Sequence, residues 1–169
     1  MDAKNFYSAD AKVCRVCNMK VNDDAIKWDY QKIRHFFCSK QCLNRFREYP
    51  HLYIGDPRLG KAEKQKGTRV IKCHKLHLKE CLDDRDRKKV IQQLNTLMGI
   101  KNIDIKGKQI IISYDLMEVS LGDIEVCIES AVGSVDSSGF KGLKQKLVHF
   151  SEECELDSLS QITKGHRHG

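Results

Sequence analysis

Two pairs of cysteines near the start of the chain have the residue type and the spacing that bind metal ions. Two residues separate Cys14 from Cys17, three separate Cys38 from Cys42, and twenty lie between the pairs. A C-x2-C loop brings two thiolates to within about 4 Å, and a second pair at the start of a helix completes a tetrahedral all-sulfur site, which suits Zn²⁺. The spacing therefore predicts a four-cysteine metal site.

The number of ligands indicates what the metal does. Catalytic zinc keeps one position open for water, whereas four protein ligands close the site. A domain of about 55 residues buries little apolar surface, and a structural zinc compensates for the small core. We therefore expect a structural zinc. Transport of a soft ion such as Cu(I) through the same thiolates remains an alternative.

The residues between and after the two pairs predict the elements that position them. Residues 25–37 alternate as in a β-hairpin that turns near Gln31 and Lys32. Ser39 then precedes a helix over residues 40–49, for which it is a suitable N-cap, and Pro50 ends that helix.

Residues 14–53 resemble a known family of small metal-binding modules. The stretches CRVCNMKV and HFFCSKQCLNRFREYPHLY are similar to the YHS/TRASH domain, a treble clef found in metal-handling proteins that include heavy-metal P-type ATPases. Asn18 stands where the family pattern has glycine, and asparagine also accepts a left-handed backbone. The resemblance implies a treble-clef fold and a bound metal.

Composition and charge bound the class of protein. The chain has 169 residues, of which 40% are hydrophobic and 31% charged, and a net charge of +7. These values describe a globular chain rather than a disordered one. No apolar run approaches the ~20 residues of a membrane span, and the first residues lack a signal-peptide pattern, so we expect a cytoplasmic protein without membrane insertion. Residues 58–108 are the most basic part, with fifteen Lys and Arg against six Asp and Glu.

The second half of the chain predicts a separate domain. Residues 68–78 have strand character, residues 83–99 form an amphipathic helix, residues 100–116 read as a hairpin, and residues 120–132 form a helix capped by Ser120. This order matches a split βαβ, ferredoxin-like unit. Residues 143–162 fit either a last strand or a helix.

The expected fold class is α+β, with a small zinc treble clef followed by a ferredoxin-like βαββαβ domain. The domain boundaries follow from composition: a four-cysteine domain over 1–56, a basic linker over 57–67, the second domain over 68–162 and a flexible tail over 163–169.

The second domain resembles the heavy-metal-associated domain of small copper chaperones, without that family's metal loop. Where the family has Met-x-Cys-x-x-Cys, this chain has Cys81, Asp83 and Asp86. The aspartates suit a helix N-terminus better than a hard-metal site. Just upstream, Cys73, His77 and Cys81 form a possible second metal site; the alternative is a core cysteine with exposed histidines.

No nucleophile elbow, phosphate loop or zinc-protease helix is present, so we expect no enzyme. The expected function is zinc or copper binding in heavy-metal trafficking, homeostasis or sensing, with a metal transporter or a metal-dependent target as protein partner. A regulator that binds nucleic acid is the alternative. Either partner would contact the basic residues Lys64, Lys66, Arg69, Lys72, Lys75 and Lys79. A third interpretation is an iron–sulfur carrier that uses Cys73, Cys81, Cys127 and Cys154.

Overall fold

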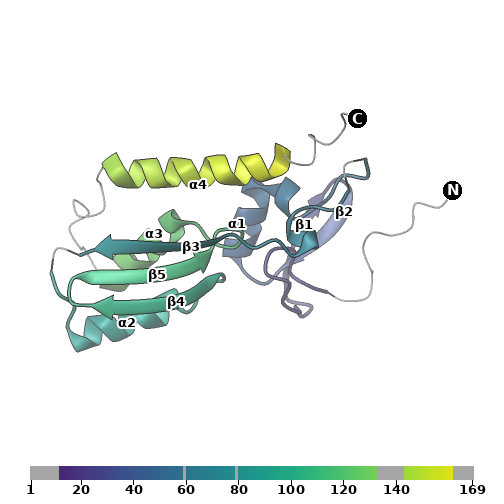
Figure 1. Ribbon diagram of the computed structural model, residues 1–169. Coiled ribbons are helices and arrows are strands. Elements are labelled where there is room, and N and C mark those ends of the chain that lie inside the picture. The colour runs from purple at the N-terminus through teal and green to yellow at the C-terminus, as the bar shows by residue number, and fades with distance from the viewer. Residues whose placement is uncertain (1–11, 59, 79, 133–142, 162–169) are drawn as a thin grey trace.

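The computed structural model describes residues 12–58, 60–78, 80–132 and 143–161, which form a mixed α+β protein with two small antiparallel sheets (Figure 1). The expected α+β class is therefore confirmed.

The N-terminal half contains the predicted hairpin and helix. Strand β1 (Ile26–Tyr30) pairs with β2 (Ile33–Phe37) in antiparallel register. Gln31 and Lys32 form the two-residue turn and both have positive φ, 50° and 65°, as a type I′ turn requires. Helix α1 (Lys40–Glu48) follows, and the Ser39 side chain accepts a hydrogen bond from the Cys42 amide as its N-cap. Pro50 begins a 3₁₀ turn, η1 (Pro50–Leu52).

The C-terminal half contains a three-stranded sheet with helices on one side. The elements are β3 (Ile71–His77), α2 (Asp84–Leu94), β4 (Ile100–Lys106), β5 (Gln109–Asp115) and α3 (Leu121–Val132). Strand β5 lies in the centre, with β3 and β4 antiparallel to it on either side. The order strand–helix–strand–strand–helix is the one that the hydrophobic pattern predicted.

Side chains at the helix starts explain where these helices begin. Asp83 accepts a hydrogen bond from the Asp86 amide as the N-cap of α2, and Ser120 accepts one from the Asp123 amide at the start of α3. These caps confirm the helix-start interpretation of Asp83 and Ser120. Helix α2 ends at Leu94, earlier than predicted, and the chain then turns into β4 through Gly99 at φ 99°. A side chain at Gly99 would come within 2.8 Å of the Glu118 Cβ.

The last element corrects the predicted βαββαβ order, because residues Leu143–Gln161 form a helix, α4, and not a sixth strand. Glu152 and Leu156 are buried, four residues apart as on one helix face. The sequence pattern was ambiguous because one of these inward positions is a glutamate. Figure 1 shows α4 running beside the edge strand β3. Glu152 and Glu155 of α4 face His74 and Lys72 of that strand.

One continuous apolar core extends through both halves of the described chain. The second half contributes the fully buried side chains of Val90, Leu94, Ile110, Ile112, Ile124 and Ile128, among others. The first half contributes Phe37, Phe46 and Leu52, and Phe46 has aromatic contacts with Tyr30, His35, Phe37 and Tyr53.

The segment predicted as a basic linker, 57–67, contains the short helix η2 (Lys64–Lys66), and Ala62 and Lys64 in it are buried. Its composition is that of a linker, but it packs against the rest of the chain. The predicted tail, 163–169, lies outside the described residues.

Candidate metal centre

A tight backbone loop positions the first cysteine pair. The Asn18 amide donates to the Cys14 carbonyl at 3.0 Å, and the Cys14 amide donates to the Met19 carbonyl at 2.8 Å. Asn18 has φ 61°, which confirms the left-handed backbone expected where the family pattern has glycine. The loop is joined to the hairpin by a bridge between Cys14 and Phe36.

The end of the hairpin and the start of α1 position the second pair. Cys38 follows directly after β2, and Cys42 lies in the first turn of α1. Because Ser39 caps that helix, the turn that carries Cys42 has a fixed start. Strand pairing and helix capping together bring Cys38 and Cys42 to the C-x2-C loop.

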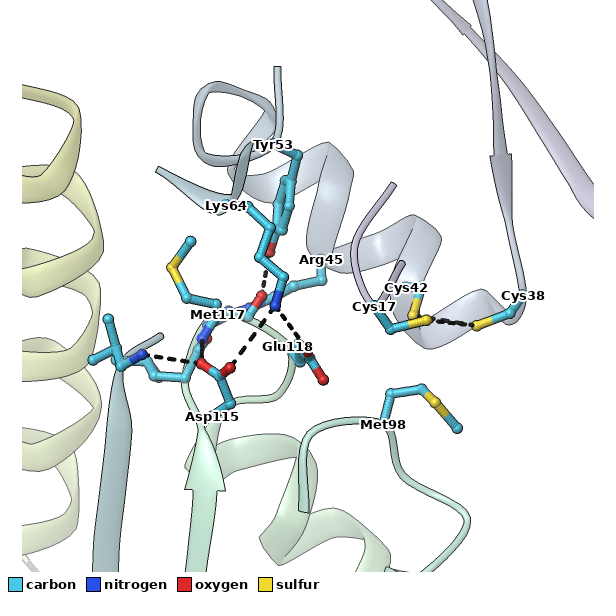
Figure 2. Close-up of polar contacts among 12 residues, drawn as sticks. Cys17, Cys38, Cys42, Arg45, Tyr53, Lys64, Met98, Asp115, Met117 and Glu118 are labelled. Carbon is cyan, nitrogen blue, oxygen red and sulfur yellow. Dashed lines mark hydrogen bonds and ion pairs between the residues drawn. The ribbon is translucent and has the colours of Figure 1, made fainter. Parts of the chain in front are cut away.

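The four sulfur atoms form a compact cluster. All lie within 4.8 Å of one another, and the Sγ–Sγ distances are 3.5 Å for Cys17 and Cys38 and 3.6 Å for Cys38 and Cys42 (Figure 2). A tetrahedral ion with metal–sulfur bonds of about 2.3 Å separates its ligands by about 3.8 Å. No disulfide joins the four, all of which are free thiols. The predicted ligands are thus brought together in a geometry that fits a metal.

Local hydrogen bonds favour a thiolate at Cys14. The neighbouring thiols of Cys17 and Cys42, and then the backbone amides of Cys17 and Cys38, donate to the Cys14 sulfur and lower the pKa of Cys14 well below its ordinary value. The pKa values of Cys17 and Cys42 are raised, mainly because the sulfur of Cys14 lies so close. Four thiolates therefore need a cation among them, since each one that ionises opposes the next.

The donor set determines which ions suit the centre. Four thiolates select soft or borderline ions such as Zn²⁺ and Cu(I) over Mg²⁺ or Ca²⁺, which prefer oxygen ligands. Cys14 and Cys42 are fully buried, while Cys17 and Cys38 are half-buried. One side of the cluster therefore lies deep in the core, and the other is partly accessible.

Residues beside the cluster connect it to the second half of the chain. Gln41 precedes Cys42, and its amide donates to the carbonyls of Met98 and Glu118 at 2.9 and 3.1 Å and accepts from the Met98 amide at 3.0 Å. Gln41 thus makes three hydrogen bonds to backbone that is more than fifty residues away in the sequence.

Other N-terminal side chains hold the same segment after β5. Arg45 donates to the Leu116 carbonyl and the Tyr53 hydroxyl to the Met117 carbonyl, both at 2.5 Å. With Gln41, they satisfy three successive carbonyls, at 116, 117 and 118. Figure 2 shows the contact between Tyr53 and Met117 near the cysteines.

Lys64 also lies in this interface between the two halves of the chain. The sequence predicted it to be a partner-binding lysine, but the structure places it in internal ion pairs. It is 8% exposed, and its ammonium group lies 2.5 Å from a Glu118 oxygen and 3.8 Å from an Asp115 oxygen. Desolvated charges of this kind require opposite charges nearby. Lys64 is therefore a structural residue of the interface, which Gln41, Arg45 and Tyr53 also build. No sequence signal pointed to these four roles.

The other predicted partner-binding residues have varied surroundings. Lys66 and Lys72 are paired with Glu63 and Glu155, Arg69 and Lys75 are exposed, and Lys79 lies outside the described residues.

The second predicted metal site is not assembled. Cys73 and His77 lie on the exposed face of β3, with their Cα atoms about 13 Å apart because His77 is four positions further along an extended strand. Cys81 is exposed after the strand. Within the described ranges, one group of three or more cysteine, histidine or acidic side chains has its ligand atoms close together, and it consists of Cys14, Cys17, Cys38 and Cys42. That group includes none of the cysteines of the iron–sulfur interpretation. His74 lies on the other face of β3, against Tyr114.

Comparisons with known proteins find no family model, no curated protein and no solved structure that matches the chain. In the part of the chain that the structure describes, no helix has the length and apolarity needed to cross a membrane.

Proposed function

We propose that this chain is a zinc protein without catalytic activity, that the four-cysteine centre holds one Zn²⁺ ion as a structural element, and that the protein acts in heavy-metal homeostasis through a protein partner. The observation that carries the proposal is the cluster of four free thiol sulfurs within 4.8 Å. The resemblance of residues 14–53 to the YHS/TRASH domain supports the role in metal handling.

A structural role is favoured by what surrounds the cluster. Two of the four ligands are fully buried, and Cys42 shares the first turn of α1 with Gln41, which holds Met98 and Glu118. A metal that fixes this turn also fixes the contact between the halves of the chain. Transfer to a partner would instead require an incoming ligand to reach the ion from the side of Cys17 and Cys38.

Metal titration and metal exchange test this proposal. The reduced, metal-free chain should bind one equivalent of Zn²⁺ in competition with a chromophoric chelator, and Cd²⁺ in its place should give a sulfur-to-metal charge-transfer band. Cys38→Ser should lose tight binding, whereas Cys73→Ser, which changes an exposed cysteine, should retain it. A structural ion should exchange slowly with excess chelator; rapid, partner-stimulated release of Cu(I) would support trafficking instead.

A further inference from the structure

The four-cysteine cluster has one side that a small reagent can reach. Cys14 and Cys42 are fully buried, whereas Cys17 and Cys38 are half-buried. A thiolate reacts as a nucleophile only where the reagent can approach its sulfur. An oxidant that enters from solvent therefore meets the sulfurs of Cys17 and Cys38 first.

The two accessible sulfurs also lie close to each other. The Sγ atoms of Cys17 and Cys38 are 3.5 Å apart (Figure 2), and a disulfide bond of about 2.05 Å would require them to approach by about 1.5 Å. Neither residue belongs to a helix or a strand, because Cys17 lies in the turn of the C-x2-C loop and Cys38 connects β2 to α1. Small shifts of these two connections can supply the movement.

The two buried cysteines are less suited to the same reaction. The Sγ atom of Cys42 is 3.6 Å from that of Cys38, but Cys42 lies in the first turn of α1, where its amide donates to the capping side chain of Ser39 at 3.3 Å. A backbone bridge to Phe36 holds Cys14 against the hairpin. The geometry therefore favours Cys17 as the partner of Cys38.

From this geometry, we propose that Cys17 and Cys38 are an oxidation site, at which a hydroperoxide such as hydrogen peroxide converts the two thiolates to a disulfide and the metal ion is released. One thiolate attacks a peroxide oxygen, the O–O bond breaks, and a hydroxide leaves a sulfenic acid behind. The second thiolate attacks that sulfur, the S–S bond forms, and the S–O bond breaks with loss of a second hydroxide. The two sulfurs are oxidised by two electrons in total, and the peroxide is reduced by the same two.

Metal release follows from the loss of two ligands. Thiolates are the form of cysteine that binds a metal, and after the reaction only Cys14 and Cys42 retain that form, too few to close a tetrahedral site. A dithiol can reduce the disulfide by exchange and restore all four ligands. Release rests on the proposed zinc centre, whereas the disulfide itself requires only the two sulfurs. Retention of the ion would thus depend on the level of oxidant.

Peroxide oxidation of the full-length protein, purified anaerobically with its metal, tests the inference. We expect stepwise addition of hydrogen peroxide to release one equivalent of Zn²⁺ per disulfide formed, read with a chromophoric chelator, and dithiothreitol with added zinc to reverse the change. Trypsin, which cleaves after Lys and Arg, separates the four ligand cysteines, so mass spectrometry after alkylation of the remaining thiols identifies the linked pair. That pair should be the peptides 16–20 and 35–40.

Three cysteines outside the cluster supply the control, because Cys73, Cys81 and Cys154 are exposed and offer peroxide other thiols. A variant that combines Cys73→Ser, Cys81→Ser and Cys154→Ser should still release zinc and give the same linked peptides. Loss of release in this variant, or a zinc-loaded protein in which a different pair or no pair of ligand cysteines is linked, would overturn the inference and leave the zinc centre in place.

A protein purified without zinc would instead refute the proposed function. Linked peptides 16–20 and 35–40 in that protein would still support the oxidation site, and their absence would overturn both proposals.

Discussion

Replacing Gln41 with alanine should weaken the contact between the two halves of the chain without removing the metal. The side chain makes three hydrogen bonds, at 2.9, 3.0 and 3.1 Å, to the backbone of Met98 and Glu118. A hydrogen bond contributes about 0.5–1.5 kcal/mol net, and a buried group left without a partner costs about 1–3 kcal/mol. Since Gln41 is half-buried and water can reach part of the gap, we expect a loss of about 2–3 kcal/mol in the free energy of unfolding.

Two optical probes separate this effect from a general destabilisation. Trp28, the single tryptophan, lies in β1 of the N-terminal half, and far-ultraviolet circular dichroism reports on both halves. In the wild type, the two denaturant-induced transitions should coincide. In Gln41→Ala they should separate, with a decrease in the melting temperature of about 5–10 °C.

The matched control is Lys40→Ala, an exposed position in the same turn of α1. It should change stability by less than about 0.5 kcal/mol. Metal content should equal that of the wild type in both variants, because neither residue is a ligand. Wild-type stability with coincident transitions in Gln41→Ala would refute the claim that this side chain couples the halves.

Three further substitutions test other contacts of the same fold. Lys64→Met should lower the free energy of unfolding by about 3–5 kcal/mol in chemical denaturation, because it leaves Asp115 and Glu118 without their cation. Lys66→Met, at an exposed lysine of the same short helix, should lower it little. Equal losses in the two variants would contradict the difference in burial between the two lysines. Phe46→Ala should cost about 3–5 kcal/mol, since Phe46 is fully buried among four aromatic rings; a loss below about 1 kcal/mol would contradict this packing. Burial lowers the pKa of His74 below its ordinary value of 6.5, so the unfolded chain binds the proton more readily than the folded one. The free energy of unfolding should therefore fall as the pH decreases below about 6.5 and level off below the folded-state pKa. The free energy of unfolding of His74→Gln, measured as a function of pH, should fall less over that range. An unchanged pH dependence would exclude His74 as its source.

Local signals in the sequence predicted much of the fold. The cysteine spacing identified the ligands that the structure clusters, and Ser39, Asp83 and Ser120 marked helix starts that the structure confirms. Each cap and each cysteine pair depends on residues a few positions apart, which is the range over which capping and periodicity act.

Contacts between segments that are distant in the sequence could not be predicted from local patterns. Lys64 lies in a polar, glycine-punctuated stretch whose composition predicts a linker and a partner-binding lysine. Its partners Asp115 and Glu118 lie about fifty residues further on, so no local pattern indicates them. The three hydrogen bonds of Gln41 are equally non-local. Helix α4 was ambiguous because its inward face carries Glu152, whose carboxylate is satisfied by the Leu121 amide and the Tyr114 hydroxyl.

The most direct test of the four-cysteine centre is elemental analysis of anaerobically purified wild type beside Cys38→Ser and Cys81→Ser. We predict one zinc per chain in the wild type and in Cys81→Ser, with loss of both the metal and the cooperative unfolding transition in Cys38→Ser. A folded wild type without metal, or a full equivalent of zinc retained in Cys38→Ser, would contradict the claim that these four cysteines hold a structural ion.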